Sequence, residues 1–341
     1  MDVGFSRAGF DVLWANDFNK EACATYRLNH YNPIHCGSID DYLPQLGSQF
    51  TPGDIDCLFG GPPCQGFSVA GKMDPDDPRS QLVWSYMKAV EMIRPRCFVM
   101  ENVKALACLE KFKAIREGLI QKATSLGYRV ELHVLNAKDF GVSQNRERMF
   151  LIGFHESFAS RLPSSFQEQL DAQRKPGTLL KDLLKPLGKP LNPNNQKVCR
   201  AKITLAKNPV LRASPYAGML FNGQGRPLNL SGYASTLPAT MGGNRTPIID
   251  EKALYEGEEP WIEHYHRQIM TTGPRIDIDT LVPSFLRRIT IEEAMAIQSF
   301  PADYHFFGTQ SAVFKQIGNA VPCSLAESIA HGVKGILQHL D

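Results

Sequence analysis

The sequence has eight cysteines but no C-x-x-C pair. The single cysteines favour neither a disulfide framework nor a zinc site, so most are expected to be small buried side chains. His264 and His266, in an acidic segment, are interpreted as a surface pair, and no metal is expected. The cysteines are Cys23, Cys36, Cys57, Cys64, Cys97, Cys108, Cys199 and Cys323.

Long apolar runs are also missing. None approaches the roughly 20 residues of a membrane-spanning helix, and no basic and apolar leader opens the chain. With 43% hydrophobic and 21% charged residues, the composition is that of a soluble globular protein. We therefore expect a cytoplasmic protein with no membrane partner, whose 341 residues leave room for two lobes.

Acidic residues are scarce in one long segment. Between Arg174 and Arg245 there are twelve lysines and arginines and a single acid, Asp182, which gives this segment a charge of +11. The rest of the chain must then carry −9, because the total is +2. A basic segment rich in Asn, Gly, Pro and Ser is either a surface that binds a polyanion or a solvated loop region.

What the sequence does contain, over its first 155 residues, is an alternation of strand-like and helix-like segments. Such an alternation predicts an α/β fold with a mostly parallel sheet and helices on both faces. Strands are expected at 12–15, 55–59, 97–100, 128–135 and 149–154, and helices at 18–30, 81–93 and 112–126.

From about residue 156 to 283 the pattern gives way to prolines, glycines and polar residues, which predicts a second, irregular lobe. Thr290 and Glu293 then form a capping box at the start of a helix that ends near Ser299. A final helix is expected from about Pro322 to Leu340. Both are expected to pack on the first lobe, giving a discontinuous domain of residues 1–155 and 285–341, with 156–284 as the second domain.

Polar clusters follow or precede four of the apolar runs. Asp17, Cys64 and the pair Glu101-Asn102 stand after strand-like segments, and a Gln-Asn-Arg-Glu-Arg run at 144–148 precedes another. Open α/β sheets place their chemistry beyond the carboxyl ends of their strands. Cys64, held in the stiff Gly-Pro-Pro-Cys-Gln-Gly loop of residues 61–66, is therefore a candidate nucleophile.

The order of these clusters resembles the DNA (cytosine-5)-methyltransferase family across nearly the whole chain. The resemblance implies a Rossmann-like, doubly wound methyltransferase domain and a smaller, irregular target-recognition domain. The matching segments are Gly-Pro-Pro-Cys-Gln-Gly-Phe-Ser (61–68), Glu-Asn-Val (101–103), Gln-x-Arg-x-Arg (144–148), Arg-Arg-Ile-Thr (287–290), Gln-x-Phe-Pro (298–301) and Gln-x-Gly-Asn-Ala-Val (316–321).

The resemblance assigns catalytic roles to four residues. The thiolate of Cys64 would add to carbon 6 of cytosine and make carbon 5 nucleophilic. Glu101 would hydrogen-bond the ring N3 and the amine while sharing or holding a proton, so a raised pKa is expected. Arg146 would contact the cytosine O2 or the thiolate. Arg148 either supports the thiolate or forms a structural salt bridge.

The implied methyl donor is S-adenosylmethionine. Asp17 would accept hydrogen bonds from its ribose hydroxyls and Phe18 would stack on its adenine. Ser38 stands where the family usually has an acid that contacts the adenine amine, and Ile39 would pack on the ring. The remaining candidate cofactor-binding residues are Pro62, Leu82, Asn319 and Val321.

The implied partner is double-stranded DNA, from which the target cytosine must be flipped out to reach Cys64. Ser68 and Lys72, in a loop suited to close over DNA, would contact phosphates. In the basic segment, Thr236 is a candidate backbone contact and Arg245 could read a guanine edge. The resemblance further implies a monomer from a restriction–modification system, whose cognate endonuclease is not a physical partner.

The chain departs from the family at its start. The family opens with a strand followed by Phe-x-Gly-x-Gly, whereas residues 1–10 resemble the helix after that loop, with Gly9 as its C-cap. We expect that the native chain begins upstream of Met1. The alternative is a truncated homologue, inactive or dependent on a second chain for the missing strand.

Two other classes compete with this interpretation. A tRNA cytosine-5 methyltransferase of the same fold would carry a Cys-Phe-Thr segment in its second lobe, which this sequence lacks. A Cys/His hydrolase would need a histidine in one of the strand-end clusters, and none is present there. The recognition sequence in DNA cannot be derived from the irregular lobe.

Overall fold

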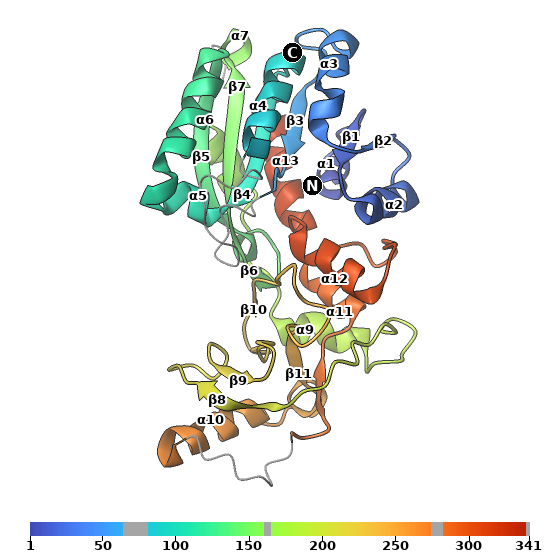
Figure 1. The fold of residues 1–341 in the computed structure, drawn as a ribbon, viewed down its shortest axis with the longest axis vertical. Helices are drawn as coiled ribbons and strands as arrows, with labels where there is room; N and C mark the ends of the chain where they lie inside the picture. Colours follow the sequence, from blue (N-terminus) through green and yellow to red (C-terminus); the bar gives the residue numbers. More distant parts are fainter. Residues whose placement is uncertain (64–80, 160–164, 274–281, 339–341) are drawn as a thin grey trace. The chain divides into compact units, whose positions relative to one another are not determined.

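The structure, a computed structural model, describes residues 1–63, 81–159, 165–273 and 282–338. The chain divides into two compact units (Figure 1). Unit 1 comprises residues 1–140, 146–175 and 324–341, and unit 2 comprises residues 141–145 and 176–323. Among the described residues, no helix has the length and apolar character needed to cross a membrane.

Unit 1 alternates strands and helices over most of its length, as the sequence predicts. Its elements are α1 (Asp2–Arg7), β1 (Ala15–Asp17), α2 (Lys20–Asn29), β2 (Ile34–Cys36), α3 (Ile39–Gln49), β3 (Cys57–Gly60), α4 (Leu82–Ile93), β4 (Cys97–Val103), α5 (Lys104–Cys108), α6 (Lys113–Ser125), β5 (Tyr128–Asn136), β7 (Glu147–His155), α7 (Glu156–Ala159), α8 (Phe166–Asp171) and α13 (Cys323–Leu337).

The main sheet of unit 1 has the order β3-β4-β7-β5, and β1 and β2 form a separate parallel pair. β3 and β4 are parallel, but β7 runs antiparallel to both β4 and β5. The expected mostly parallel sheet is therefore a mixed one. The reversal of β7 has a consequence for the site, because it brings the start of β7 beside the carboxyl end of β4.

Helices cover both faces of this sheet. On one face Phe98 and Met100 of β4 pack with Val83 of α4 and Leu119 of α6. On the other face Phe59 of β3 stacks on Phe5 of α1, with ring centroids 3.9 Å apart. α13 also belongs to unit 1, where Lys334 donates to the carbonyl of Ala8 at 2.9 Å. The alternation of strand residues between the two faces produces the three layers.

A substitution at Gly153 should show how tightly these layers pack. Gly153 of β7 lies opposite Phe98, and a Cβ added there would overlap the buried Phe98 ring. We expect Gly153→Ala to lower the free energy of unfolding by about 1–3 kcal/mol, the usual cost of overpacking a core, as measured by urea denaturation. Gly243→Ala is the matched control, since a Cβ at Gly243 would meet nothing within 4 Å. Equal stability of both variants would contradict this account.

The predicted boundaries in unit 1 hold best for the apolar segments. Gly9, with φ of +86°, follows the end of α1, as the C-cap prediction requires. The first predicted strand, residues 12–15, is wrong, because β1 begins at Ala15 and continues through Asn16 and Asp17. β2 and α3 were not predicted.

Unit 2 is built from short strands and helices around its own core. Its elements are β6 (Gln144–Asn145), α9 (Leu180–Leu184), β8 (Leu205–Val210), β9 (Met219–Phe221), β10 (Ala234–Ser235), β11 (Ile248–Asp250), α10 (Trp261–Thr272), β12 (Leu286–Arg288), α11 (Ile291–Ile297) and α12 (Gln310–Asn319).

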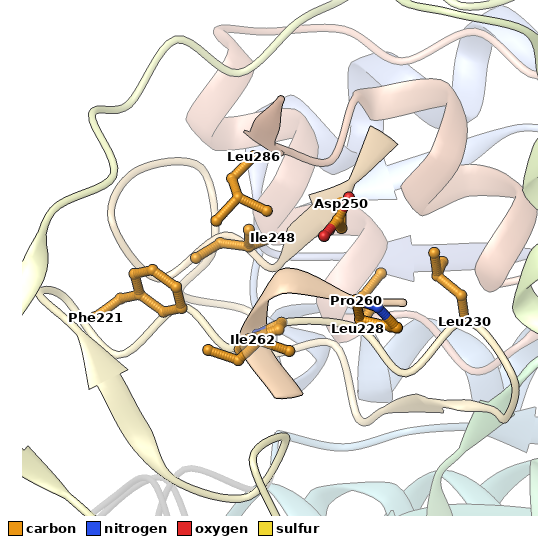
Figure 2. A pocket seen from close by; sticks show the side chains of 9 residues that line it. Phe221, Leu228, Leu230, Ile248, Asp250, Pro260, Ile262 and Leu286 are labelled. Carbon is orange, nitrogen blue, oxygen red and sulfur yellow. The ribbon is translucent and has the colours of Figure 1, made fainter. Parts of the chain in front are cut away.

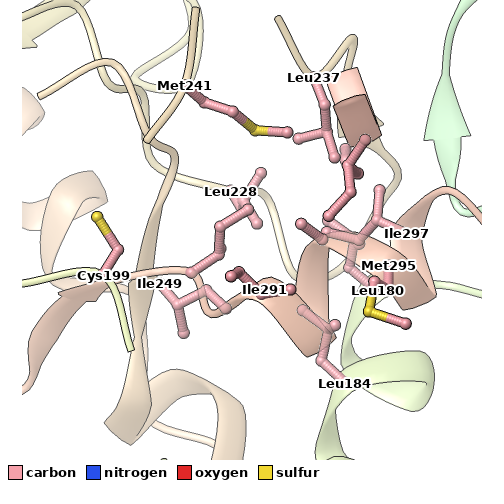
Figure 3. Packing of buried hydrophobic residues seen from close by; sticks show 14 of the residues in the cluster. Leu180, Leu184, Cys199, Leu228, Leu237, Met241, Ile249, Ile291, Met295 and Ile297 are labelled. Atoms are coloured by element: carbon pink, nitrogen blue, oxygen red, sulfur yellow. The ribbon is translucent and has the colours of Figure 1, made fainter. Parts of the chain in front are cut away.

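The core of unit 2 explains where the chain divides. Leu180 and Leu184 of α9 pack with Ile291 and Ile297 of α11 and with Leu237 (Figure 3). The expected domains, 1–155 with 285–341 and 156–284, therefore differ from the compact units at residues 285–323, which share this apolar core with the basic segment. That the expected boundaries separate the catalytic domain from the target-recognition domain stays a prediction. The capping box of Thr290 and Glu293 is confirmed.

A small pocket of unit 2 lies beside α10 (Figure 2). Its lining is apolar, with Phe221, Ile248 and Ile262, except for Asp250. The Asp250 carboxylate accepts hydrogen bonds from the backbone of Ala253 at 3.1 Å and of Trp261 at 2.9 Å. Asp250 therefore fixes the start of α10, and its carboxylate has a structural role.

The histidine pair of the sequence analysis lies on α10. The interpretation as a surface pair is wrong for His266, which is buried and whose Nε2 lies 2.8 Å from the carbonyl of Arg212, while His264 is exposed. Two residues apart on a helix, their side chains project in different directions. This difference explains why one of them is packed and the other solvated.

Candidate active site

Glu101 of β4 and Arg148 of β7 form an ion pair at the end of the main sheet. Arg148 lies opposite Val103 in the strand register, so its side chain and that of Glu101 project from the same face. Arg148 Nε lies 3.0 Å from Glu101 Oε1, and both side chains are mostly buried. Of the two roles left open for Arg148, the structure therefore shows a salt bridge, made to a predicted catalytic carboxyl.

Burial raises the pKa of Glu101, in the expected direction, while the charges of Arg148 and Arg146 oppose this shift. Arg146 is among the largest fully buried side chains, with 1% exposure. Its backbone is fixed on both sides, since its N–H donates to Asn136 Oδ1 at 3.2 Å and its carbonyl accepts from Ala137 at 3.0 Å. A buried carboxyl with a raised pKa, beside the guanidinium group of Arg148, can hold a proton or share it with a bound base.

The segment that leads to Cys64 runs directly past this carboxyl. A Cβ added to Gly61 would lie 3.0 Å from Glu101 Oε2, so the absence of a side chain at Gly61 lets the main chain approach this carboxyl closely. Asn102 donates from Nδ2 to the carbonyl of Pro62 at 3.2 Å and holds the next residue in place. Cys64 itself lies outside the described residues, as do Ser68 and Lys72.

Asp17 and Phe18 form a second candidate site at the carboxyl end of β1. Asp17 Oδ1 accepts from the backbone of Asn19 at 2.8 Å, and burial raises the pKa of its carboxyl. The Phe18 ring is 62% exposed and available for stacking. A partly buried acid beside an open aromatic ring fits the ribose and adenine of an adenosine group.

The other predicted cofactor residues are less informative. Ser38 is the N-cap of α3, and its hydroxyl accepts from the backbone of Asp40 at 3.3 Å. Ile39 and Leu82 are half-buried first residues of α3 and α4. Asn319 and Val321 belong to unit 2, where Asn319 is the exposed last residue of α12 and Val321 is buried.

The two predicted DNA contacts that the structure describes lie in unit 2. Thr236 is exposed, and its hydroxyl donates to the carbonyl of Asn145 at 3.1 Å. It directly follows β10, which pairs in parallel with β6. Arg245 is exposed in a turn region. Both side chains can therefore reach a ligand from the surface.

Sequence reasoning gave no role to Gly61, Asn102, Gln144 or Gln298, although all four stand in the quoted segments. Gly61 and Asn102 position the start of the Cys64 loop, as described above. Gln144 and Gln298 are fully buried polar side chains in unit 2 and hydrogen-bond to each other. Their place in the quoted segments was the available signal for the two glutamines, because buried amides are retained where they are hydrogen-bonded.

An acid–arginine pair thus lies at the carboxyl end of β4 in an α/β sheet, beside the Gly-Pro-Pro segment that leads to Cys64. The chain belongs to the C-5 cytosine-specific DNA methylases, whose family model matches residues 1–335. It is therefore a DNA (cytosine-5)-methyltransferase.

Individual relatives agree with this assignment. The Type II methyltransferase M.FnuDI of Fusobacterium nucleatum is 31% identical, over 99% of this chain and 92% of that protein. M.MthTI of Methanothermobacter thermautotrophicus is 30% identical, over 99% of this chain and 94% of that protein. The solved Dnmt2 methyltransferase of S. pombe has the same fold, with a TM-score of 0.65 and 14% identity over all of this chain and 95% of that one.

Proposed function

We propose that this enzyme methylates carbon 5 of a cytosine flipped out of a specific double-stranded DNA sequence, through a covalent bond between Cys64 and carbon 6. The observation that carries the proposal is the approach of Gly61 to Glu101, because it brings the backbone three residues before Cys64 to a buried acid. The Nε of Arg148 lies 3.0 Å from the carboxyl of this acid. A nucleophile, a proton-holding acid and cations within one small region are what cytosine activation needs.

The residues of the chain would act in a fixed order. The Cys64 thiolate adds to carbon 6 while Glu101, protonated, hydrogen-bonds ring N3 and stabilises the charge that develops there. Carbon 5 thereby becomes nucleophilic and would take a methyl group from a sulfonium donor, which would leave as a neutral thioether. Transfer of the proton from carbon 5 to solvent and expulsion of the thiolate would then restore the aromatic ring and the free enzyme. Arg146 and Arg148 stabilise the anionic groups throughout.

We propose S-adenosylmethionine as the methyl donor, which supplies an electrophilic methyl group on a sulfonium. Asp17 and Phe18 fit its adenosine part, as described above. Ser38, Ile39, Pro62, Leu82, Asn319 and Val321 are further candidate contacts.

Asp17→Asn tests the adenosine site. Asparagine keeps the oxygen that accepts from Asn19 but replaces the other acceptor with an NH₂ group. We expect the Kd of S-adenosylhomocysteine, measured by calorimetry, to rise about tenfold or more, because a hydrogen bond to a charged group contributes about 1.5–3 kcal/mol. Asp11→Asn, at an exposed position, is the control. Equal affinities of the two variants would remove Asp17 from the site.

The DNA side of the proposal rests on charge and position. Ser68 and Lys72 would contact phosphates near the catalytic loop, while Thr236 and Arg245 would belong to the recognition surface of the basic segment. The Type II names of the relatives favour a modification enzyme of a restriction–modification system. We propose that it acts in the cytoplasm as a monomer, independently of the cognate endonuclease.

Bisulfite sequencing of DNA from cells that express the enzyme tests the function directly. Protection of cytosines within one short sequence is the expected result, and this sequence is then the recognition site. No protected site in DNA, with methylation of tRNA instead, would contradict the proposal.

A further inference from the structure

Helix α12 approaches residues 238–242 of unit 2 main chain to main chain. A Cβ added to Gly318, in the last turn of the helix, would lie 2.5 Å from the carbonyl oxygen of Pro238. A Cβ added to Gly242 would lie 2.9 Å from the Cα of Ser311, in the first turn. Glycine at both positions removes the side chains that would separate the two segments. A displacement of either segment is therefore transmitted to the other by direct contact.

Two buried glutamines connect the same segments by hydrogen bonds. Gln298, just after α11, donates from Nε2 to the carbonyls of Ile317 at 2.6 Å and Ala320 at 3.3 Å. Its Oε1 accepts from Gln144 Nε2 at 3.2 Å. Gln144 Oε1 in turn accepts from the backbone of Leu237 at 3.3 Å. Neither side chain is exposed to solvent, so water does not compete for these bonds.

The two ends of this chain of hydrogen bonds lie beside residues with different proposed ligands. Leu237 follows Thr236, a proposed DNA contact. Ala320 stands between Asn319 and Val321, which are proposed to contact the cofactor. The backbone of Cys323 also donates to the carbonyl of Gln298 at 3.1 Å, which fixes the chain beyond Val321. The glutamine pair therefore fixes the positions of the two proposed ligand-binding segments relative to each other.

We propose that Gln144 and Gln298 are positioning residues that couple target DNA binding to cofactor binding. DNA that orders residues 236–238 would, through this pair, also order residues 319–321, so that each ligand raises the affinity for the other. Such a coupling is reciprocal by thermodynamic necessity and is typically 5–150-fold in affinity. The inference rests on the proposed function, since it uses both ligands named there.

The test measures the Kd of S-adenosylhomocysteine by calorimetry, with and without a short duplex that contains the cytosine mapped by bisulfite sequencing. For the unaltered enzyme we expect the duplex to lower this Kd at least about fivefold. In Gln144→Met this factor should fall towards one, while the Kd without DNA changes little, because the bonds from Gln298 to Ile317 and Ala320 remain. The Kd of the duplex, with and without S-adenosylhomocysteine, must change by the same factor.

Gln310→Met is the matched control. Gln310 is the first residue of α12 and donates a comparable bond, but from its Nε2 to the carbonyl of Val198 at 2.8 Å, not to either glutamine. Its loss should leave the coupling factor unchanged. If the two glutamines act as a single link, replacing both should not reduce the coupling factor further than the more damaging of the two single substitutions does.

Several results would overturn the proposal. These are a coupling factor near one in the unaltered enzyme, an unchanged factor in Gln144→Met, or an equal loss in Gln310→Met. Failure of Gln144→Met to fold at the assay temperature also counts against it, since a positioning link should be separable from stability. Failure of the proposed function is distinct from these results, because the unaltered enzyme would then methylate no DNA site.

Discussion

Replacing Cys64 with serine should abolish methyl transfer to DNA and leave DNA binding intact. A serine hydroxyl is far less acidic than a thiol and does not provide the anion that adds to carbon 6. Because the whole covalent route depends on this bond, we expect the rate to fall by several orders of magnitude. Transfer of a labelled methyl group from S-adenosylmethionine measures the loss, and a gel-shift assay with the mapped duplex measures binding.

Cys108→Ser provides the control for this substitution. Cys108 is an exposed free thiol at the end of α5, and its replacement should leave the rate unchanged. A duplex with fluorine in place of hydrogen at carbon 5 gives a second measurement, because the methylated adduct then has no proton on carbon 5 whose loss would expel the thiolate, and should stay attached to the unaltered enzyme. Full activity of Cys64→Ser, or an adduct formed by it, would rule out the covalent mechanism.

The sequence predicts the buried elements of unit 1 well and its polar or interrupted elements poorly. The sequence predicts β4 and β7 because each contains an uninterrupted apolar run, residues 97–100 and 149–154, as expected for strands covered on both faces. β1 was misplaced because Asn16 and Asp17 belong to it despite their polarity, through backbone pairing with residues 34–36. α3 was missed because Pro44 and Gly47 interrupt an otherwise helical segment.

Strand direction and close approach depend on the tertiary structure. The antiparallel course of β7 is set by its pairing with β4 and β5, which no local pattern records. The sequence placed Glu101 and Arg148 at strand ends, but the register decides that they project from the same face. Likewise, Gly61 appears in the sequence as part of a stiff loop, and its contact with Glu101 becomes visible only in three dimensions.

The second large effect is expected from Glu101→Gln, which should reduce kcat by about 10²–10⁴-fold, the usual contribution of a general acid or base. Glutamine preserves the volume and most hydrogen bonds of glutamic acid but cannot release or accept a proton. The Kd of the mapped duplex should change little, so that the loss appears in kcat. A kcat within a few-fold of the unaltered enzyme would exclude proton transfer by Glu101.

The pH dependence of the rate tests whether Arg148 lowers the pKa of Glu101. If protonated Glu101 hydrogen-bonds ring N3, activity falls as the pH rises through the pKa of this carboxyl. The charge of Arg148 lowers that pKa against the effect of burial, so Arg148→Met should raise it and move the falling limb of the profile to higher pH. Lys104→Met is the control, since Lys104 pairs with Glu147 at 2.8 Å in a more exposed ion pair. If the falling limb of the pH profile does not move in Arg148→Met, or is still present in Glu101→Gln, a group other than Glu101 causes the fall in rate.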